Sequence, residues 1–224
     1  MIGPVMVNER ILVFSRTTGY RHDSIPTGVA TLRDIGVEHR FDVDATEESA
    51  AFATGNLERY SAVVFLSTSG EVFNDEQLQA LAAYVRGGGG YVGVHAAATT
   101  EYGWGFYGEL VGARFRRHPP TQEAVLDVED RGHPATRHLA DTWTWKDEWY
   151  DFRTDPRRLV HVLLSVDEST YDGGEMGPGH PIAWCHEVGA GRCFYTALGH
   201  RDDVLESDWY GAHLLAGIKW ALGN

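Results

Sequence analysis

The sequence has little cysteine and no long apolar run. Its 224 residues include only two cysteines, Cys185 and Cys193, which excludes a disulfide-dense secreted scaffold. The pair flanks a turn-like segment, Val188–Gly191, and this spacing would allow a cross-hairpin disulfide. Without a secretory signal, however, we expect reduced thiols in a cytoplasmic protein. No window approaches the roughly 18 consecutive apolar residues of a membrane helix, so we expect no membrane span.

Basic residues are also scarce. Lysine and arginine together number 19 against 32 aspartates and glutamates, which gives a formal net charge of −13. Such a chain repels a phosphate backbone, and we therefore expect no nucleic-acid partner. The one basic cluster, Arg114 with Arg116 and Arg117, is interpreted as a solvated surface segment. A small neutral or weakly charged ligand fits this charge balance better.

No linker or internal repeat divides the chain. Hydrophobic residues at 43% and charged residues at 23% are typical of a soluble globular protein. A chain of this length can bury one large core, whereas a second full domain would be cramped. We therefore expect a single domain over residues 1–224.

The first half of the chain alternates between strand and helix patterns. Short apolar runs predict strands over residues 10–15, 41–45, 62–66 and 91–94. One amphipathic helix is expected to begin at a Ser24 cap and end at Gly36, and another to begin at Asn74 and stop at the glycines 87–90. This alternation predicts a doubly wound, mostly parallel α/β sheet of flavodoxin-like type.

The second half is less regular and elaborates this sheet. Further strands are predicted over residues 121–130, 159–166, 182–186 and 192–197. The last two are expected to pair as a β-hairpin, while residues 121–130 alternate like a half-exposed strand. A tryptophan-rich segment occupies residues 142–150, and a closing helix is predicted over residues 209–222.

His95 directly follows the predicted strand 91–94. In open α/β sheets, ligands bind beyond the carboxyl ends of the strands. Gly93-Val94-His95-Ala96-Ala97 also has the spacing of a nucleophile elbow, in which small residues allow a sharp turn that projects one side chain. An imidazole in that place can transfer a proton, hydrogen-bond a carbonyl or ligate a metal. The alternative is a histidine satisfied by backbone groups under a loop.

The motifs around this elbow resemble the ThuA-like (trehalose utilisation) family, which has a class I glutamine amidotransferase-like fold. The resemblance covers nearly the whole chain, with its motifs in the same order. It is carried by RILVFS (10–15), TGYRHDS (18–24), GGGYVGVHAA (88–97), KDEWY (146–150), HPIAW (180–184), GRCFYTALGH (191–200) and IKWALG (218–223).

The resemblance also excludes an activity. The amidotransferases of this fold carry a cysteine at the elbow, where this chain has His95, and both cysteines of this chain lie in the predicted hairpin. Glutamine hydrolysis through a thioester should therefore be absent. The fold further implies that a late histidine, His200, approaches His95 in space, and we expect both to be catalytic.

The loop after the first strand offers Tyr20, Arg21 and His22 as substrate-binding residues. A surface ion pair for Arg21 and helix capping for His22 are the alternatives. His118 precedes a proline pair that stiffens the chain, which suits a ligand-facing side chain and equally suits an exposed turn. We expect His118 to contact the substrate as well.

Asp147, Glu148 and Tyr150 lie among the three tryptophans of the 142–150 segment. Indole rings that stack on a sugar, beside a carboxylate, would form a carbohydrate site, whereas core packing is the alternative. We expect Glu148 to be the catalytic acid because apolar neighbours raise the pKa of a carboxyl group. Asp147 and Tyr150 are then expected to bind substrate, although the choice of Glu148 over Asp147 stays open.

Several histidines with one or two carboxylates can hold a metal ion. None of the common ligand spacings, such as H-x-H or H-x-x-x-H, occurs among the candidate residues. The sequence therefore requires no cofactor, and a divalent metal is compatible with it.

The family resemblance implies carbohydrate catabolism through cleavage of 3-keto-glycosides such as 3-keto-trehalose, made by a partner dehydrogenase. A ketone at C3 acidifies the C2 proton, so a base can remove it while C1 expels its leaving group and water then adds. His95 and His200 are expected as base and ketone polariser, with Glu148 as the acid. The alternatives are a non-catalytic sugar-binding module and a metal-dependent hydrolase of another substrate. Exposed aromatic residues are compatible with a homodimer.

Overall fold

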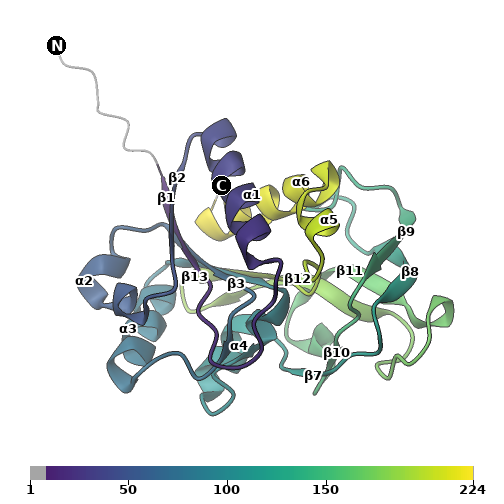
Figure 1. Cartoon of the computed structure of the whole chain (residues 1–224), viewed down its shortest axis with the longest axis horizontal. Helices are drawn as coiled ribbons and strands as arrows, with labels where there is room; N and C mark the ends of the chain where they lie inside the picture. The colour runs from purple at the N-terminus through teal and green to yellow at the C-terminus, as the bar shows by residue number, and fades with distance from the viewer. Residues whose placement is uncertain (1–8, 224) are drawn as a thin grey trace.

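One sheet of nine strands runs through the middle of the computed structural model, which describes residues 9–223 (Figure 1). The strand order is β2-β1-β3-β5-β13-β12-β11-β8-β9. Neighbours among the first five strands are parallel. The remaining pairings are antiparallel. The α/β class and the doubly wound arrangement predicted from the sequence are confirmed.

The parallel half of the sheet contains the short apolar runs of the sequence. Its strands are β1 (Arg10–Phe14), β2 (Asp42–Thr46), β3 (Ala62–Leu66), β5 (Gly90–Val94) and β13 (Gly191–Thr196). β3 and β5 are buried along their whole length, as expected for parallel strands covered on both faces. Because these strands are parallel, the loops after them meet at one edge of the sheet.

The antiparallel half extends the sheet from the predicted hairpin. Its strands are β12 (His180–Val188), β11 (His161–Asp167), β8 (Gln122–Val128) and β9 (Thr142–Asp147). β12 and β13 form the hairpin, with β13 pairing β5 on its other side. β11 begins two residues later than predicted, because Leu159 is exposed at the end of the 3-10 helix η3 (Pro156–Arg158).

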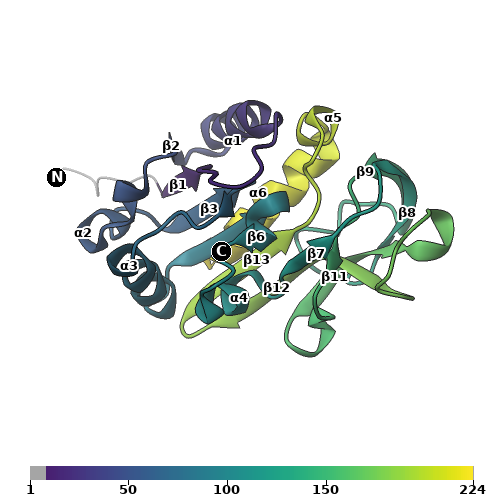
Figure 2. The same ribbon diagram turned by 60° about the horizontal axis from the view of Figure 1, so that its bottom comes forward.

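Helices cover both faces of the parallel half (Figure 2). One face carries α1 (Ile25–His39), α5 (Asp202–Leu205) and α6 (Asp208–Leu222). The other carries α2 (Thr54–Leu57), α3 (Asp75–Arg86) and α4 (Gly105–Val111). Among residues 9–223, no helix combines the length and apolar character needed to cross a membrane.

The two predicted helix starts differ in the structure. Asn74 caps α3 as predicted and takes part in a capping box. Ser24 occupies the N-cap of α1, but its hydroxyl makes no cap bond and donates to the carbonyl of Gly199. α1 also continues past Gly36, its predicted end, to His39. The missing side chain of Gly36 lets the helix lie close to β2, because a Cβ at this position would be 2.6 Å from the Val43 side chain.

Short elements border the edge where the parallel strands end. They are the paired strands β4 (Ser69–Gly70) with β6 (Thr99–Thr100) and β7 (Phe115–Arg117) with β10 (Asp151–Phe152), and the 3-10 helices η1 (Ser49–Phe52), η2 (His95–Ala98) and η4 (Glu168–Thr170). Only one turn of 3-10 helix therefore follows His95, and the next α-helix begins at residue 105.

The predicted basic cluster does not form one solvated segment. Arg114 is partly buried, and its guanidinium donates to the carbonyls of Glu101 and Trp104. Arg116 and Arg117 both pair with the carboxylate of Glu175. The prediction was wrong for Arg114 because several backbone carbonyls converge on its position.

Candidate functional site

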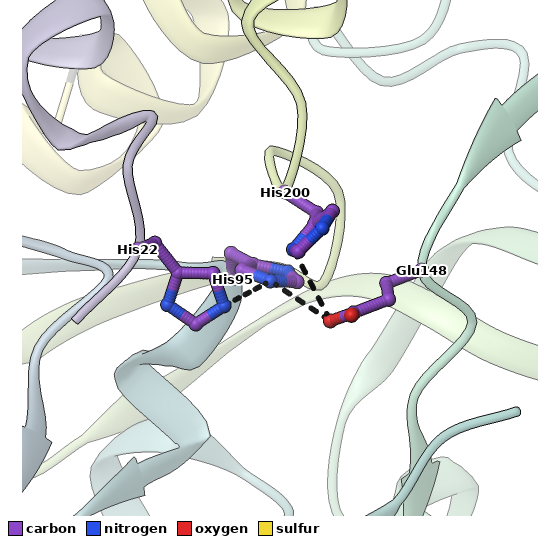
Figure 3. Close-up of side chains that lie close together, drawn as sticks. All are labelled: His22, His95, Glu148 and His200. Atoms are coloured by element: carbon purple, nitrogen blue, oxygen red, sulfur yellow. Dashed lines mark hydrogen bonds and ion pairs between the residues drawn. The ribbon is translucent and has the colours of Figure 1, made fainter. Parts of the chain in front are cut away.

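Three histidines meet at the carboxyl edge of the parallel strands. His22 lies in the loop after β1, His95 directly after β5, and His200 in the loop after β13. Glu148, which follows the antiparallel strand β9, points toward them from the other half of the sheet (Figure 3). One potential ligand atom from each of the four residues lies within 4.8 Å of the others. The predicted approach of His200 to His95 is therefore present.

His95 lies at a sharp turn. Its φ of 50° is the left-handed conformation that residues with a side chain rarely adopt. Ala96 and Ala97 are buried beside it, so small side chains are needed there. Gly93 is equally constrained, since a Cβ would lie 2.9 Å from the ring of Tyr195. These features are those of the elbow predicted from the sequence.

The His95 ring is fully buried and surrounded by polar groups. Its Nδ1 lies 2.7 Å from the carbonyl oxygen of Ala197. Because a carbonyl only accepts, Nδ1 carries the proton and Nε2 of the neutral ring carries the lone pair. That Nε2 lies 2.9 Å from the Tyr150 hydroxyl and 3.1 Å from Nε2 of His22. A single lone pair thus faces two potential donors.

Burial keeps the neighbouring imidazoles neutral. It lowers the pKa of His22 from 6.5 to about 3, with further lowering by the charges of His95 and His200. Burial also lowers the pKa of His200, whose side chain is one-quarter exposed. At neutral pH both rings therefore offer uncharged nitrogen atoms. Among residues 9–223, Nδ1 of His22 has no hydrogen-bond partner.

Glu148 lies at the centre of the histidines. Its Oε2 is 3.5 Å from Nε2 of His95 and 3.3 Å from Nδ1 of His200, whereas Oε1 is 3.4 Å from Nδ1 of His118. Burial alone would raise the pKa of Glu148, but the surrounding rings of His95, His200 and His118 lower it below its usual value. The carboxyl group is therefore ionised, and the predicted rise in its pKa was wrong because histidines, not indoles, surround it.

The tryptophans of residues 142–150 point away from this cluster. Trp143 and Trp145 pack edge-on against Trp209. Trp149 is buried, and its Nε1 donates to the carbonyl of Gln122. Of the two interpretations of these tryptophans, packing is therefore correct, and an indole platform for a sugar is not formed.

A cavity of about 520 Å³ opens beside the cluster, within the range of roughly 300 to 1,000 Å³ that is usual for small-molecule sites. Tyrosine and phenylalanine side chains dominate its wall. It is lined by Gly19, Tyr20, His22, Ser69, Gly70, Ala96, Thr99, Tyr102, Phe115, His118, Glu148 and Tyr150. Five of the predicted site residues are among them.

A second hollow of about 470 Å³ adjoins the other side of the cluster. It contains polar and acidic residues: Tyr20, His22, Asp23, Ser24, His200, Arg201, Asp202, Asp203 and Glu206. His22 and Tyr20 belong to both hollows. The histidine cluster therefore lies between them.

Two predicted substrate-binding residues lie outside the cavity wall. The guanidinium of Arg21 is 2.7 Å from the Glu47 carboxylate in an exposed ion pair. This is the surface ion pair expected from the sequence as the alternative to substrate binding. Asp147 is fully buried and accepts hydrogen bonds from the backbone N–H groups of Gly199 and Glu148. Asp147 thus joins the loop that carries His200 to the residue that forms the centre of the cluster.

A second buried group supports the site from behind. His180 begins β12, and its Nε2 donates to the backbone carbonyl of Tyr150. Its Nδ1 lies 3.1 Å from the Tyr171 hydroxyl and 3.0 Å from Glu168. Sequence reasoning missed this support and also the cavity residues Tyr102 and Phe115. The signal for His180 was the HPIAW motif, whereas the two aromatic residues follow no motif.

Comparison with known proteins places this geometry in a family. A model of the ThuA family, described as trehalose utilisation, matches residues 10–221. A protein from Bacteroides uniformis ATCC 8492 described as ThuA-like is 21% identical with a TM-score of 0.78, and the match covers 95% of this chain and 91% of that one. A comparison with curated proteins gave no match.

Other solved structures share the fold. A protein from Parabacteroides merdae ATCC 43184, also described as ThuA-like, is 23% identical with a TM-score of 0.81 and coverages of 96% and 90%. A β-galactosidase from Bacillus circulans sp. alkalophilus is 13% identical with a TM-score of 0.59, covering 96% of this chain and 30% of that chain. These identities show a common fold alone. From the family match over residues 10–221, the chain belongs to the ThuA (trehalose utilisation) family, which supports a role in carbohydrate metabolism.

Proposed function

We propose that the protein cleaves 3-keto-glycosides, with 3-keto-trehalose as a representative substrate. One observation carries the proposal: an ionised, buried carboxylate and four imidazoles converge beside a cavity that is lined by aromatic residues. Membership of a family described as trehalose utilisation supports a glycoside as the substrate. Glutamine hydrolysis is no part of the proposal, because the elbow residue is His95 and not a cysteine.

The reaction begins at the proton on C2, which the C3 ketone makes acidic. A base takes this proton, the C1–O bond breaks, and the electron pair forms a C1=C2 double bond conjugated with the ketone. The proton then passes to the leaving oxygen, which departs as the second sugar. Water adds across the double bond, so the net reaction is hydrolysis. The site must supply a base and a donor to the ketone.

His118 is the base that the geometry favours, in place of the buried His95. Its Nδ1 lies 2.9 Å from the carbonyl of Pro119, so Nδ1 carries the proton and Nε2 has the free lone pair. The Glu148 carboxylate, 3.4 Å from the same Nδ1, stabilises the imidazolium that forms after proton abstraction. The protonated His118 then returns its proton to the leaving oxygen, and Glu148 remains ionised throughout.

Tyr150 is the donor to the ketone. Burial raises the pKa of its hydroxyl well above 10, so the hydroxyl is protonated at neutral pH. It lines the cavity and lies 2.9 Å from Nε2 of His95. The Tyr150 hydroxyl can therefore turn its proton from His95 to the oxygen of a bound ketone.

The cavity wall fits a neutral sugar. No lysine or arginine of the described chain lines it, which disfavours a phosphorylated substrate. Tyr20, Tyr102 and Phe115 offer flat apolar surfaces beside the polar groups of Glu148 and His118. This combination suits the alternating C–H and O–H faces of a pyranose ring.

A cytoplasmic location is part of the same proposal. Cys185 and Cys193 are both buried and free, although they lie on adjacent strands of the hairpin. A chain with only two cysteines, both of them buried, has no disulfide framework of the kind that secreted domains use, which fits a reducing compartment.

Incubation of the purified protein with a 3-keto-glucoside, followed by NMR, tests the proposed activity. We expect release of the leaving sugar, and His118→Ala should slow it by roughly 10² to 10⁴-fold, the usual contribution of a general base. The exposed His39→Ala is the matched control and should retain the rate. Shifts of the sugar resonances without release, with or without added Zn²⁺, would instead favour a sugar-binding module.

A further inference from the structure

We propose that His22, His95, His200 and Glu148 bind one divalent first-row transition-metal ion. The four side chains come from four separate segments and converge on one point (Figure 3). The inference concerns the same pocket as the proposed activity but does not depend on the substrate, since metal affinity can be measured in its absence.

The spacing of the nitrogen and oxygen atoms matches a coordination shell. Ligands that lie about 2.1 Å from Zn²⁺ in tetrahedral geometry are about 3.4 Å from one another. The separations are 3.1 Å between the Nε2 atoms of His22 and His95, 3.5 Å from His95 Nε2 to Glu148 Oε2, and 3.3 Å from that oxygen to His200 Nδ1. The remaining pairs fall within 4.8 Å, so small side-chain rotations close the shell.

The hydrogen bonding also favours a shared ion. Metal-bound histidines commonly donate their second ring N–H to a backbone carbonyl, as His95 Nδ1 does to Ala197. His200 Nδ1 is buried and makes no hydrogen bond to any residue in the 9–223 range, although Glu148 Oε2 is 3.3 Å away. His200 Nδ1 and Glu148 Oε2 thus lie close together without a hydrogen bond, as two ligands of one metal ion would.

The donor set selects the class of metal. Imidazole nitrogens suit zinc, cobalt, nickel and iron, whereas magnesium and calcium require shells of oxygen atoms. Glu148 binds through Oε2, which faces His95 and His200, and leaves Oε1 toward His118. His118 is therefore not a ligand and stays available for proton transfer.

The ion would be open to substrate on one side. His95 is fully buried behind it, but His22 and Glu148 line the cavity and His200 is partly exposed. With four protein ligands, a substrate oxygen that approaches from this side would be a fifth ligand, a coordination number that catalytic zinc can reach, and the ion would polarise it. The ketone oxygen of a bound sugar could take this place.

A second cluster of similar composition provides an internal comparison. Asp151, Glu168 and His180 also lie within 4.8 Å of one another. Both oxygens of Glu168, however, accept backbone N–H groups, and His180 Nε2 donates to the carbonyl of Tyr150. Because these atoms are already in use, we expect no ion there and a stoichiometry of one per chain.

Metal titration of the full chain tests the inference. The protein is purified without a histidine tag, treated with chelator, and titrated with Zn²⁺ by calorimetry and with Co²⁺ by visible absorption. We expect one equivalent to bind, a Co²⁺ spectrum of low coordination number and a higher Tm with Zn²⁺. His22→Ala, His200→Ala and Glu148→Gln should each weaken binding by more than roughly tenfold. His118→Ala, from the same cavity, should retain one equivalent.

Three results would overturn the inference: no stoichiometric Zn²⁺ binding to the folded protein, equal affinity in the His200→Ala variant, or equal affinity for Mg²⁺. Circular dichroism of each variant establishes that it is folded. Metal binding without release of a leaving sugar would refute only the proposed activity. Sugar release by chelator-treated protein that binds no metal would refute only the metal site.

Discussion

The Nε2 atom of His95 accepts a hydrogen bond of 2.9 Å from the hydroxyl of Tyr150, a residue that lines the cavity. The direction of the bond follows from the other ring nitrogen, because Nδ1 donates to the carbonyl of Ala197. The elbow histidine is therefore held in one tautomer, and it connects the cavity wall to the buried sheet. Its position links a fully buried residue to Tyr150, which lines the cavity.

Tyr150→Phe should remove the donor to the ketone and leave the fold intact. Loss of one donor that stabilises a developing oxyanion lowers kcat by roughly 10² to 10³-fold, and we expect an effect of that order on sugar release. Steady-state kinetics with a 3-keto-glucoside measure it. Tyr171→Phe is the matched control, since its buried hydroxyl contacts His180 and not the cavity. Full activity of Tyr150→Phe would exclude the proposed role.

Asp147→Asn should destabilise the protein and displace His200. Each oxygen of Asp147 accepts one backbone N–H, from Gly199 and from Glu148. An asparagine would place its NH₂ group against one of these donors, and a buried unsatisfied pair costs about 1 to 3 kcal/mol. Urea denaturation measures the change, with the exposed Asp141→Asn as the control. Unchanged stability would show that Asp147 does not hold the two segments together.

The sheet and the elbow could be predicted because each is encoded locally. Runs of apolar residues marked β1, β3 and β5, and the spacing of small residues around His95 marked the turn. The rule that ligands bind at the carboxyl ends of parallel strands then selected the loop that holds His22, whereas the approach of His200 to His95 was implied by the resemblance to the family's fold.

The parts that could not be predicted depend on contacts between distant segments. The ionised state of Glu148 is set by imidazoles from three other loops, which a count of neighbouring tryptophans does not reveal. The α1 helix does not end at Gly36, although glycine has a low helix propensity, because the close packing of the helix against Val43 requires a residue without a side chain. Arg21 was assigned to the substrate because its ion-pair partner, Glu47, is remote in sequence.

His213 should make stability depend on pH between about 6.5 and 4. It is fully buried on α6, and burial lowers its pKa from 6.5 to about 4, although Nδ1 donates to the carbonyl of Ala135. Above pH 6.5 the ring is neutral in both states. As pH falls toward 4, only the unfolded chain binds the proton, so stability decreases by up to about 3 kcal/mol from this residue.

His213→Gln should flatten this pH dependence, measured by urea denaturation at pH 7, 6 and 5. Lost packing can lower stability at every pH, so the slope and not the absolute value is the readout. His39→Gln, at the exposed end of α1, should retain the slope of the original protein. An identical slope in His213→Gln would mean that other groups dominate the titration.

Gly93 and Gly211 form a matched pair that tests whether packing fixes the elbow. A Cβ at Gly93 would lie 2.9 Å from the ring of Tyr195, whose hydroxyl donates to the carbonyl of His95. A Cβ at Gly211, on α6, would meet no atom within 4 Å. Gly93→Ala should therefore destabilise the protein by about 1 to 3 kcal/mol through overpacking and slow sugar release by shifting His95. Gly211→Ala should stabilise it by up to about 1 kcal/mol, because alanine has the higher helix propensity. Thermal denaturation and steady-state kinetics of both variants measure these effects. Equal stability and equal rates of sugar release in the two variants would show that the turn at His95 does not need the close approach of β5 to β13.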